Sequence, residues 1–68
     1  MKKYLTVSDR IKKLIESGVL KSRDKIPSIR EMSVQMNLSM MTILNGYRLL
    51  EEQGIIASHP QSGYYVRP

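Results

Sequence analysis

The side chains that could carry out chemistry are few in this sequence of 68 residues. It contains one histidine, His59, no cysteine, and hydroxyl groups that are scattered along the chain. A nucleophile, a general base and an oxyanion donor cannot be assembled from these residues, so an enzyme is the weakest interpretation. A lone histidine lacks partners to ligate a metal, and without cysteine there is neither a disulfide framework nor a thiolate zinc site. We expect no catalytic residue, no metal and no cofactor in this chain.

The remaining chemistry is electrostatic. Eleven Lys and Arg residues against six Asp and Glu residues give a net charge of +5 and a pI near 9.8, which favours a polyanionic partner. The sequence has no run of 18 apolar residues, and its start, MKKYLTVSDR, lacks the apolar segment of a signal peptide. We therefore expect no membrane association and a cytoplasmic location.

Two serines, Ser28 and Ser39, stand where helices are expected to begin. Ser28 and Glu31 have the spacing of a capping box, and Ser39 offers a second N-cap with Thr42 as its N3 residue. Apolar spacing predicts helices over about 28–36 and 39–53 with a tight turn between them, and Gly54 is placed to end the second helix in the left-handed conformation. This pattern indicates a helix-turn-helix.

Each helix of this pair has a predicted inward stripe. The stripe of the first is Ile29, Met32, Ser33 and Met36, and the stripe of the second is Ile43, Tyr47 and Leu50. The opposite face of the second helix holds Met41, Asn45, Arg48 and Glu52, with Leu44 beside them. This face is mixed rather than plainly basic, and similar helix pairs occur in bundles that bind no nucleic acid.

The elements on either side of the pair complete the predicted fold. Spacing of apolar residues from Val7 to Ile15 predicts a first helix over about 6–17, capped by Thr6 or Ser8, and a loop follows in which Lys25 and Ile26 form a very short strand. Strand-favouring residues over about 55–67 predict a β-hairpin. The fold class is α+β, mainly α: a winged helix-turn-helix with three helices and a C-terminal hairpin wing, forming one domain over 1–68.

The sequence also resembles a known family. The spacing of IPSIREMS, NLSMMTILNGYRLLEEQGII and SGYYV is similar to the DNA-binding domain of GntR-family bacterial transcription regulators over essentially residues 5 to 67. The matching positions are Gly18, Leu20, Pro27, Ser28, Arg30, Ser39, Thr42, Tyr47, Leu50, Gly54, Gly63 and Val66. The wing HPQSGYYVRP and the helix start MMT are most similar to the MocR-type subgroup, in which a large aminotransferase-like domain that binds pyridoxal phosphate follows a linker.

This resemblance implies sequence-specific binding of double-stranded DNA, with the second helix of the pair in the major groove and the wing near the backbone or minor groove. Arg30 would reach a base or a phosphate, unless it only pairs with Glu31 or Asp24 at the surface. Ser39 and Thr42 would hold phosphate, or act only as caps. The expected contact residues are Ser28, Arg30, Ser39, Met40, Met41, Thr42, Leu44, Asn45, Arg48, Gln61, Ser62 and Gly63.

The sequence departs from the family pattern at Met40, where many relatives have arginine, and at Gly46, where many have alanine. Without the arginine, Met40 or Met41 could meet a thymine methyl group or pack within the protein, and we expect core or rim packing for Met40. Gly46 either permits a close helix crossing or makes the domain less stable. Tyr47 is expected in the core, with its hydroxyl directed toward phosphate.

The resemblance also bears on the rest of the protein. It implies that the chain is the N-terminal fragment of a longer bacterial, nucleoid-associated regulator, which dimerises through a following domain that could bind pyridoxal phosphate. The chain alone is expected to be monomeric. The alternative function is a winged helix that binds protein or RNA, since the fold alone does not specify the ligand.

Overall fold

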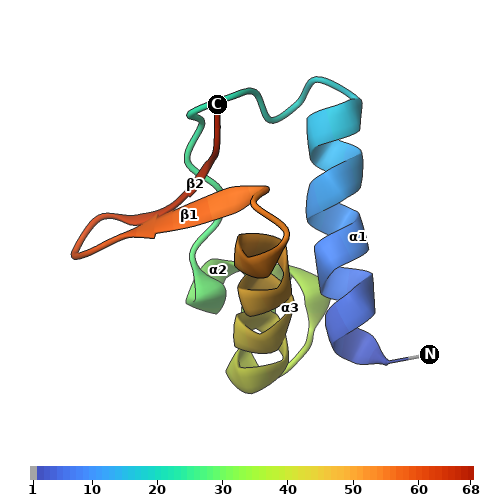
Figure 1. Cartoon of the computed structure of the whole chain (residues 1–68). Helices are drawn as coiled ribbons and strands as arrows, with labels where there is room; N and C mark the ends of the chain where they lie inside the picture. Colours follow the sequence, from blue (N-terminus) through green and yellow to red (C-terminus); the bar gives the residue numbers. More distant parts are fainter. Residues whose placement is uncertain (1) are drawn as a thin grey trace.

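The computed structural model describes residues 2–68 and shows helices on one side and a short hairpin extending from them (Figure 1). In chain order the elements are α1 (Lys3–Glu16), α2 (Ile29–Met36), α3 (Met40–Glu52), β1 (Ile56–His59) and β2 (Gly63–Val66). The predicted fold class, mainly helical with a C-terminal hairpin wing, is confirmed. None of the described helices is long and apolar enough to cross a membrane.

Helix α1 begins three residues earlier than predicted, and neither proposed cap is used. Its N-cap is Lys2, which makes no side-chain cap hydrogen bond, while Thr6 and Ser8 lie inside the helix. The buried Ser8 hydroxyl donates to the Leu5 carbonyl oxygen at 3.0 Å. Tyr4 lies inside the helix and continues the apolar stripe of Val7 and Ile11 by one turn.

The predicted caps of α2 and α3 are confirmed. The Ser28 hydroxyl accepts from the Glu31 amide at 3.1 Å, and the Glu31 carboxylate accepts from the Ser28 amide at 2.9 Å, which completes the capping box. These hydrogen bonds from Ser28 hold the pKa of Glu31 below its usual value. At α3, the Ser39 hydroxyl accepts from the Thr42 amide at 3.1 Å. Gly54 follows α3 with a φ of 74°, as predicted.

The turn between α2 and α3 has its own set of hydrogen bonds, which the sequence did not predict. Asn37 ends α2 in the left-handed conformation, with φ 55° and ψ 47°, a geometry that asparagine tolerates better than most residues. The Leu38 amide donates to the Ser33 carbonyl oxygen at 3.1 Å, and the Ser33 hydroxyl donates back to the Leu38 carbonyl oxygen. These two hydrogen bonds between Ser33 and Leu38 hold the loop against α2, and they thereby fix the direction in which α3 begins.

The core lies where α1, α2 and α3 meet the base of the hairpin. Its buried apolar residues are Val7, Ile11, Ile26, Met32, Ile43, Tyr47, Leu50, Ile56 and Val66. Of the predicted α2 stripe only Met32 is fully buried, while Ile29 and Met36 pack at the edge.

Helices α1 and α3 cross at Gly46. A Cβ atom at this position would lie 2.7 Å from the Cβ of Val7 and 2.9 Å from the carbonyl oxygen of Tyr4, closer than real Cβ contacts. Of the two interpretations offered for Gly46, the structure supports the close helix crossing.

The hairpin is tied to the body of the domain by the segment before α2. Strand β1 pairs antiparallel with β2 in the register Ile56↔Val66 to His59↔Gly63. On the other side of β2, Lys25 forms a single bridge with Tyr65, and the Ile26 amide donates to the Tyr64 carbonyl oxygen at 2.9 Å. The predicted short strand at Lys25 and Ile26 is thus limited to this one bridge.

Candidate nucleic-acid interface

Tyr47 connects the three parts of the candidate interface, which are the start of α2, helix α3 and the wing formed by β1 and β2. Its hydroxyl donates to the Pro27 carbonyl oxygen at 2.7 Å, directly before α2. Its ring packs edge to face against Tyr64 of β2, with centroids 5.0 Å apart and an interplanar angle of 71°. Burial raises the pKa of this hydroxyl. The expected orientation toward phosphate is therefore wrong, and Tyr47 instead joins α3 to the start of α2 and to the wing.

The start of α2 presents Arg30 to solvent. The surface partners considered for this guanidinium, Glu31 and Asp24, have carboxylates that already accept hydrogen bonds from backbone amides: Glu31 from Ser28, and Asp24 from Lys21 at 2.9 Å. Arg30 itself is exposed one residue inside the helix. Its side chain is therefore accessible to an anionic ligand at the positive end of α2.

The start of α3 presents two hydroxyls. Ser39 is exposed and Thr42 is half-buried, and their oxygens lie 2.8 Å apart. The Thr42 amide is occupied by the Ser39 hydroxyl, so the capping role is confirmed. Both side chains remain at the end of α3 where the helix dipole favours an anion, and their contact with phosphate stays a prediction.

The outward side of α3 carries Met40 and Met41, whose exposed fractions are 50% and 62%. Met40 lies in the first turn beside the exposed Ser39, and the buried stripe begins only at Ile43, so of the expected core or rim packing only the core position is contradicted. Asn45 and Arg48 are also exposed, and Leu44 is half-buried. The predicted outward face of α3 is confirmed in its geometry.

The tip of the wing is an ordered turn. Gln61 and Gly63 have positive φ angles of 64° and 129°. The Ser62 amide donates to the His59 carbonyl oxygen at 3.0 Å, and the Ser62 and Tyr65 hydroxyls lie 2.6 Å apart. The ring of His59 stacks edge to face on Tyr65 with centroids 4.9 Å apart. The tip therefore projects as a supported structure, shown at the far left of Figure 1, beyond the start of α2.

Lys25 is a cation of this surface that the sequence did not single out. A Cβ atom at Gly63 would lie 3.1 Å from Cε and 3.8 Å from Nζ of Lys25, so the lysine side chain runs across β2 where the wing turn ends. The charge of Lys25 also contributes to lowering the pKa of Glu31 on α2. Lys25 thus places a positive charge between the start of α2 and the wing. No local sequence signal indicates this location, because it depends on the pairing of Lys25 with Tyr65, 40 positions further along the chain.

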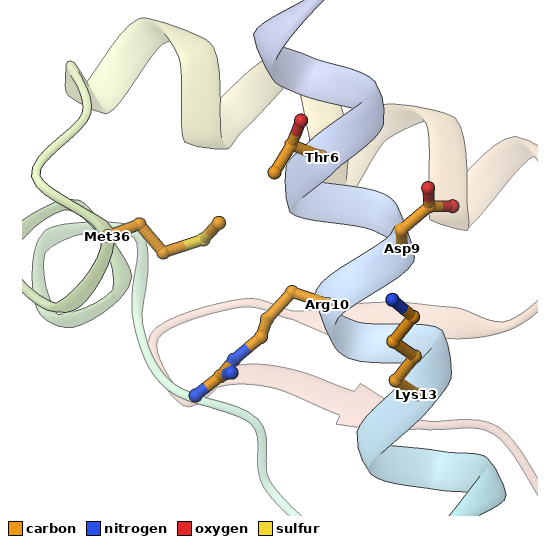
Figure 2. A pocket seen from close by; sticks show the side chains of 5 residues that line it. All are labelled: Thr6, Asp9, Arg10, Lys13 and Met36. Atoms are coloured by element: carbon orange, nitrogen blue, oxygen red, sulfur yellow. The ribbon is translucent and has the colours of Figure 1, made fainter.

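An open hollow lies elsewhere, between α1 and the end of α2 (Figure 2). It is lined by Thr6, Asp9, Arg10, Lys13 and Met36. None of the predicted contact residues lines it, and it offers no cluster of His, Cys, Asp or Glu suited to a metal among residues 2–68. We therefore do not include this hollow in the candidate interface.

Helices α2 and α3 with their tight turn, followed by a supported hairpin, define a winged helix-turn-helix domain. A family model described as "Bacterial regulatory proteins, gntR family" matches residues 3–66. The chain belongs to this family.

Similar proteins include regulators that are much longer than this chain. The uncharacterized HTH-type transcriptional regulator YdcR of Escherichia coli (strain K12) is 43% identical over 68 residues, which is the whole chain but 14% of YdcR. The HTH-type pyridoxine biosynthesis transcriptional regulator PdxR of Corynebacterium glutamicum is 27% identical over 62 residues, covering 91% of this chain and 14% of PdxR. The chain thus spans about one-seventh of the length of these curated relatives.

Among solved structures, AraR(DBD) in complex with operator ORX1 superimposes with a TM-score of 0.93 at 30% sequence identity. The match covers 97% of this chain and 80% of the AraR chain. The similarity extends over all three helices and the wing, since it leaves out only a few residues.

Proposed function

We propose that this chain binds a specific sequence of double-stranded DNA, as the DNA-binding domain of a bacterial transcription regulator. The observation that carries the proposal is that Tyr47, on the buried side of α3, joins this helix to the start of α2 and to the wing, while the opposite side of α3 stays exposed. The net charge of +5 and the similarity to AraR(DBD), solved with an operator, support it. Helix α3 would enter the major groove, and the wing would lie near the backbone or minor groove. Selection of bound duplexes from a random DNA pool tests the proposal, because a protein-interaction module would select none.

The proposed contacts fall into two groups. Ser28, Ser39, Thr42 and the wing tip from Gln61 to Gly63 would contact phosphate or sugar and set the position of the domain on the duplex. Side chains on the exposed side of α3, together with Arg30, would meet the edges of bases. This division follows from the two helix N-termini and from the exposed residues of α3.

For the complete protein we infer a longer regulator of the MocR type, acting in the cytoplasm at the nucleoid. The similarity to PdxR and the short share of YdcR and PdxR that the chain covers support this inference. A following aminotransferase-like domain would bind pyridoxal phosphate and would pair two regulators into a homodimer. The absorbance spectrum of the purified complete protein would test whether pyridoxal phosphate is bound, and its sedimentation would test whether it is a dimer.

Arg30→Ala should weaken binding to the selected duplex by about 1–3 kcal/mol, because a guanidinium contact to a base edge or phosphate is lost. Arg10→Ala is the matched control, since Arg10 is also exposed but lies on α1 beside the open hollow. Fluorescence anisotropy with a labelled duplex would measure both affinities. Equal losses for the two variants would show that the start of α2 does not face the DNA.

Affinity should fall steeply as salt rises, because cationic side chains release counterions from the phosphates that they contact. Lys25→Met keeps most of the side-chain stem and removes the charge beside Gly63. The slope of log K against log salt should therefore become shallower by about 0.9 in this variant, the value for one phosphate contact. Lys13→Met, which changes an exposed lysine of α1, is the control and should keep the original slope. An unchanged slope for Lys25→Met would show that Lys25 does not contact a phosphate.

A further inference from the structure

Three apolar side chains form one patch on the exposed side of α3. Met40 and Leu44 are four residues apart and therefore lie one above the other on the helix, and Met41 adjoins them. Met40 is 50% exposed, Met41 is 62% exposed and Leu44 is half-buried. We call Met40, Met41 and Leu44 the α3 apolar patch.

The α3 apolar patch is not required by the core of the domain. The inward side of α3 is already occupied by Ile43, Tyr47 and Leu50, which are fully buried. The patch is bordered by the exposed polar residues Ser39, Asn45 and Arg48. An exposed apolar patch with a polar border is typical of a contact surface. Since the patch begins in the first turn of α3, it lies at the part of a recognition helix that meets base edges.

The chemistry of these side chains limits what they can recognise. A thioether or an isobutyl group offers no strong donor to guanine O6 or N7 and no amide pair for adenine. The apolar group that normal base pairs present in the major groove is the C5 methyl of thymine. Methionine is flexible and polarisable, so two adjacent methionines can adapt to methyl groups on neighbouring base pairs.

We propose that the α3 apolar patch selects thymine by burying its C5 methyl groups against Met40 and Met41, with Leu44 covering their inner side. This inference rests on the proposed function of DNA binding and specifies how part of the sequence is recognised. Burying a methyl-sized group contributes about 0.8 kcal/mol, which corresponds to about a fourfold change in Kd. Two contacted thymines should thus contribute about 16-fold to the affinity.

Replacing thymine by deoxyuridine tests the proposal directly, because this change removes the methyl group and keeps every hydrogen-bonding atom of the base. The wild-type chain would first be used to select duplexes from a random pool. Each thymine of the selected site would then be replaced singly by deoxyuridine and the Kd measured by anisotropy. We expect a loss of about fourfold at two or more positions and no loss at the others.

Protein variants connect this loss to the patch. In Met40→Ala and in Met41→Ala, one of the sensitive thymines should become insensitive to deoxyuridine, because the side chain that buried its methyl group is gone. Val34→Ala on α2 is the matched control: Val34 is 77% exposed and apolar but lies outside the patch, so every deoxyuridine effect should persist. The Tm of each variant should match that of the wild type, since Met40, Met41 and Val34 are all exposed.

Each result has a clear meaning. A selected site without thymine, a Kd unchanged by deoxyuridine at every position, or a deoxyuridine effect that persists in both methionine variants would overturn the proposal while leaving DNA binding intact. Failure of the wild-type chain to enrich any duplex would instead overturn the proposed function, and this inference with it.

Discussion

Two copies of this domain that are joined so as to reach neighbouring half-sites should bind DNA about 10²–10⁴ times more tightly than one copy. The second contact then becomes intramolecular, and its effective concentration is set by the linker. Half-sites one helical turn apart are separated by roughly 34 Å. A Gly/Ser linker of about 40 residues has a root-mean-square length close to this distance.

The comparison requires one chain, a tandem of two chains, and two duplexes. One duplex carries two half-sites about 10 bp apart, and in the other duplex one half-site is scrambled. The tandem should lose its advantage on the scrambled duplex, while the single chain should bind both at similar, micromolar or weaker affinity.

The expected weakness of the single chain follows from its surface. Among the described residues, the large apolar side chains that are exposed are Leu5, Val19, Val34, Met40 and Met41. These side chains are few and are spread over several elements. They therefore do not form a continuous apolar surface large enough to bury the roughly 800 Å² per partner of a standard interface. The single chain should therefore sediment as a monomer. A tight dimer, or nanomolar binding of one copy to one half-site, would contradict this prediction.

Gly46→Ala should destabilise the domain, although alanine is the better helix former by about 1 kcal/mol. The added methyl group would lie 2.7 Å from Val7 and 2.9 Å from the Tyr4 carbonyl oxygen, so α1 and α3 would have to move apart. Overpacking of this kind costs about 1–3 kcal/mol and occasionally more. Because the clash involves backbone, we expect the upper end of this range, which after the gain in helix propensity leaves a net loss of about 2 kcal/mol, a large share of the roughly 3–10 kcal/mol expected for a domain of this size.

Thermal melting followed by circular dichroism measures this effect, with a decrease in Tm of roughly 10 °C expected. Asn45→Ala is the matched control, because Asn45 precedes Gly46 in the same helix but is exposed. There alanine adds helix propensity without a clash, so the Tm should stay the same or rise slightly. If Gly46→Ala raised the Tm as well, the two helices would have to be further apart than the structure shows.

The parts of the fold that the sequence predicts well are those set by local chemistry. Ser28 with Glu31 and Ser39 with Thr42 place the starts of α2 and α3, because a cap needs only residues within one turn. The start of α1 was misplaced because its N-cap, Lys2, makes no side-chain cap hydrogen bond, so the sequence carries no capping signal there.

The parts that could not be predicted depend on contacts between distant residues. The Tyr47 hydroxyl meets Pro27, and the Lys25 stem meets Gly63; neither neighbour follows from periodicity. Met40 was expected in the core or at its rim, and its place in the first turn of α3 leaves it half exposed and outside the core. The residue types of the candidate interface were therefore predictable, but the way in which the elements hold them together was not.

The segment before α2 also affects how the domain behaves at high concentration. The Arg23 amide and the Asp24 carbonyl oxygen pair with Val66, and the Ile26 amide pairs with the Tyr64 carbonyl oxygen, so three backbone groups on the outer edge of β2 are already used. An open strand edge is a template for pairing with other chains and thus for aggregation or strand exchange. Since basic side chains of Arg23 and Lys25 border this covered edge, β2 is protected from edge-to-edge association by backbone pairing and by charge.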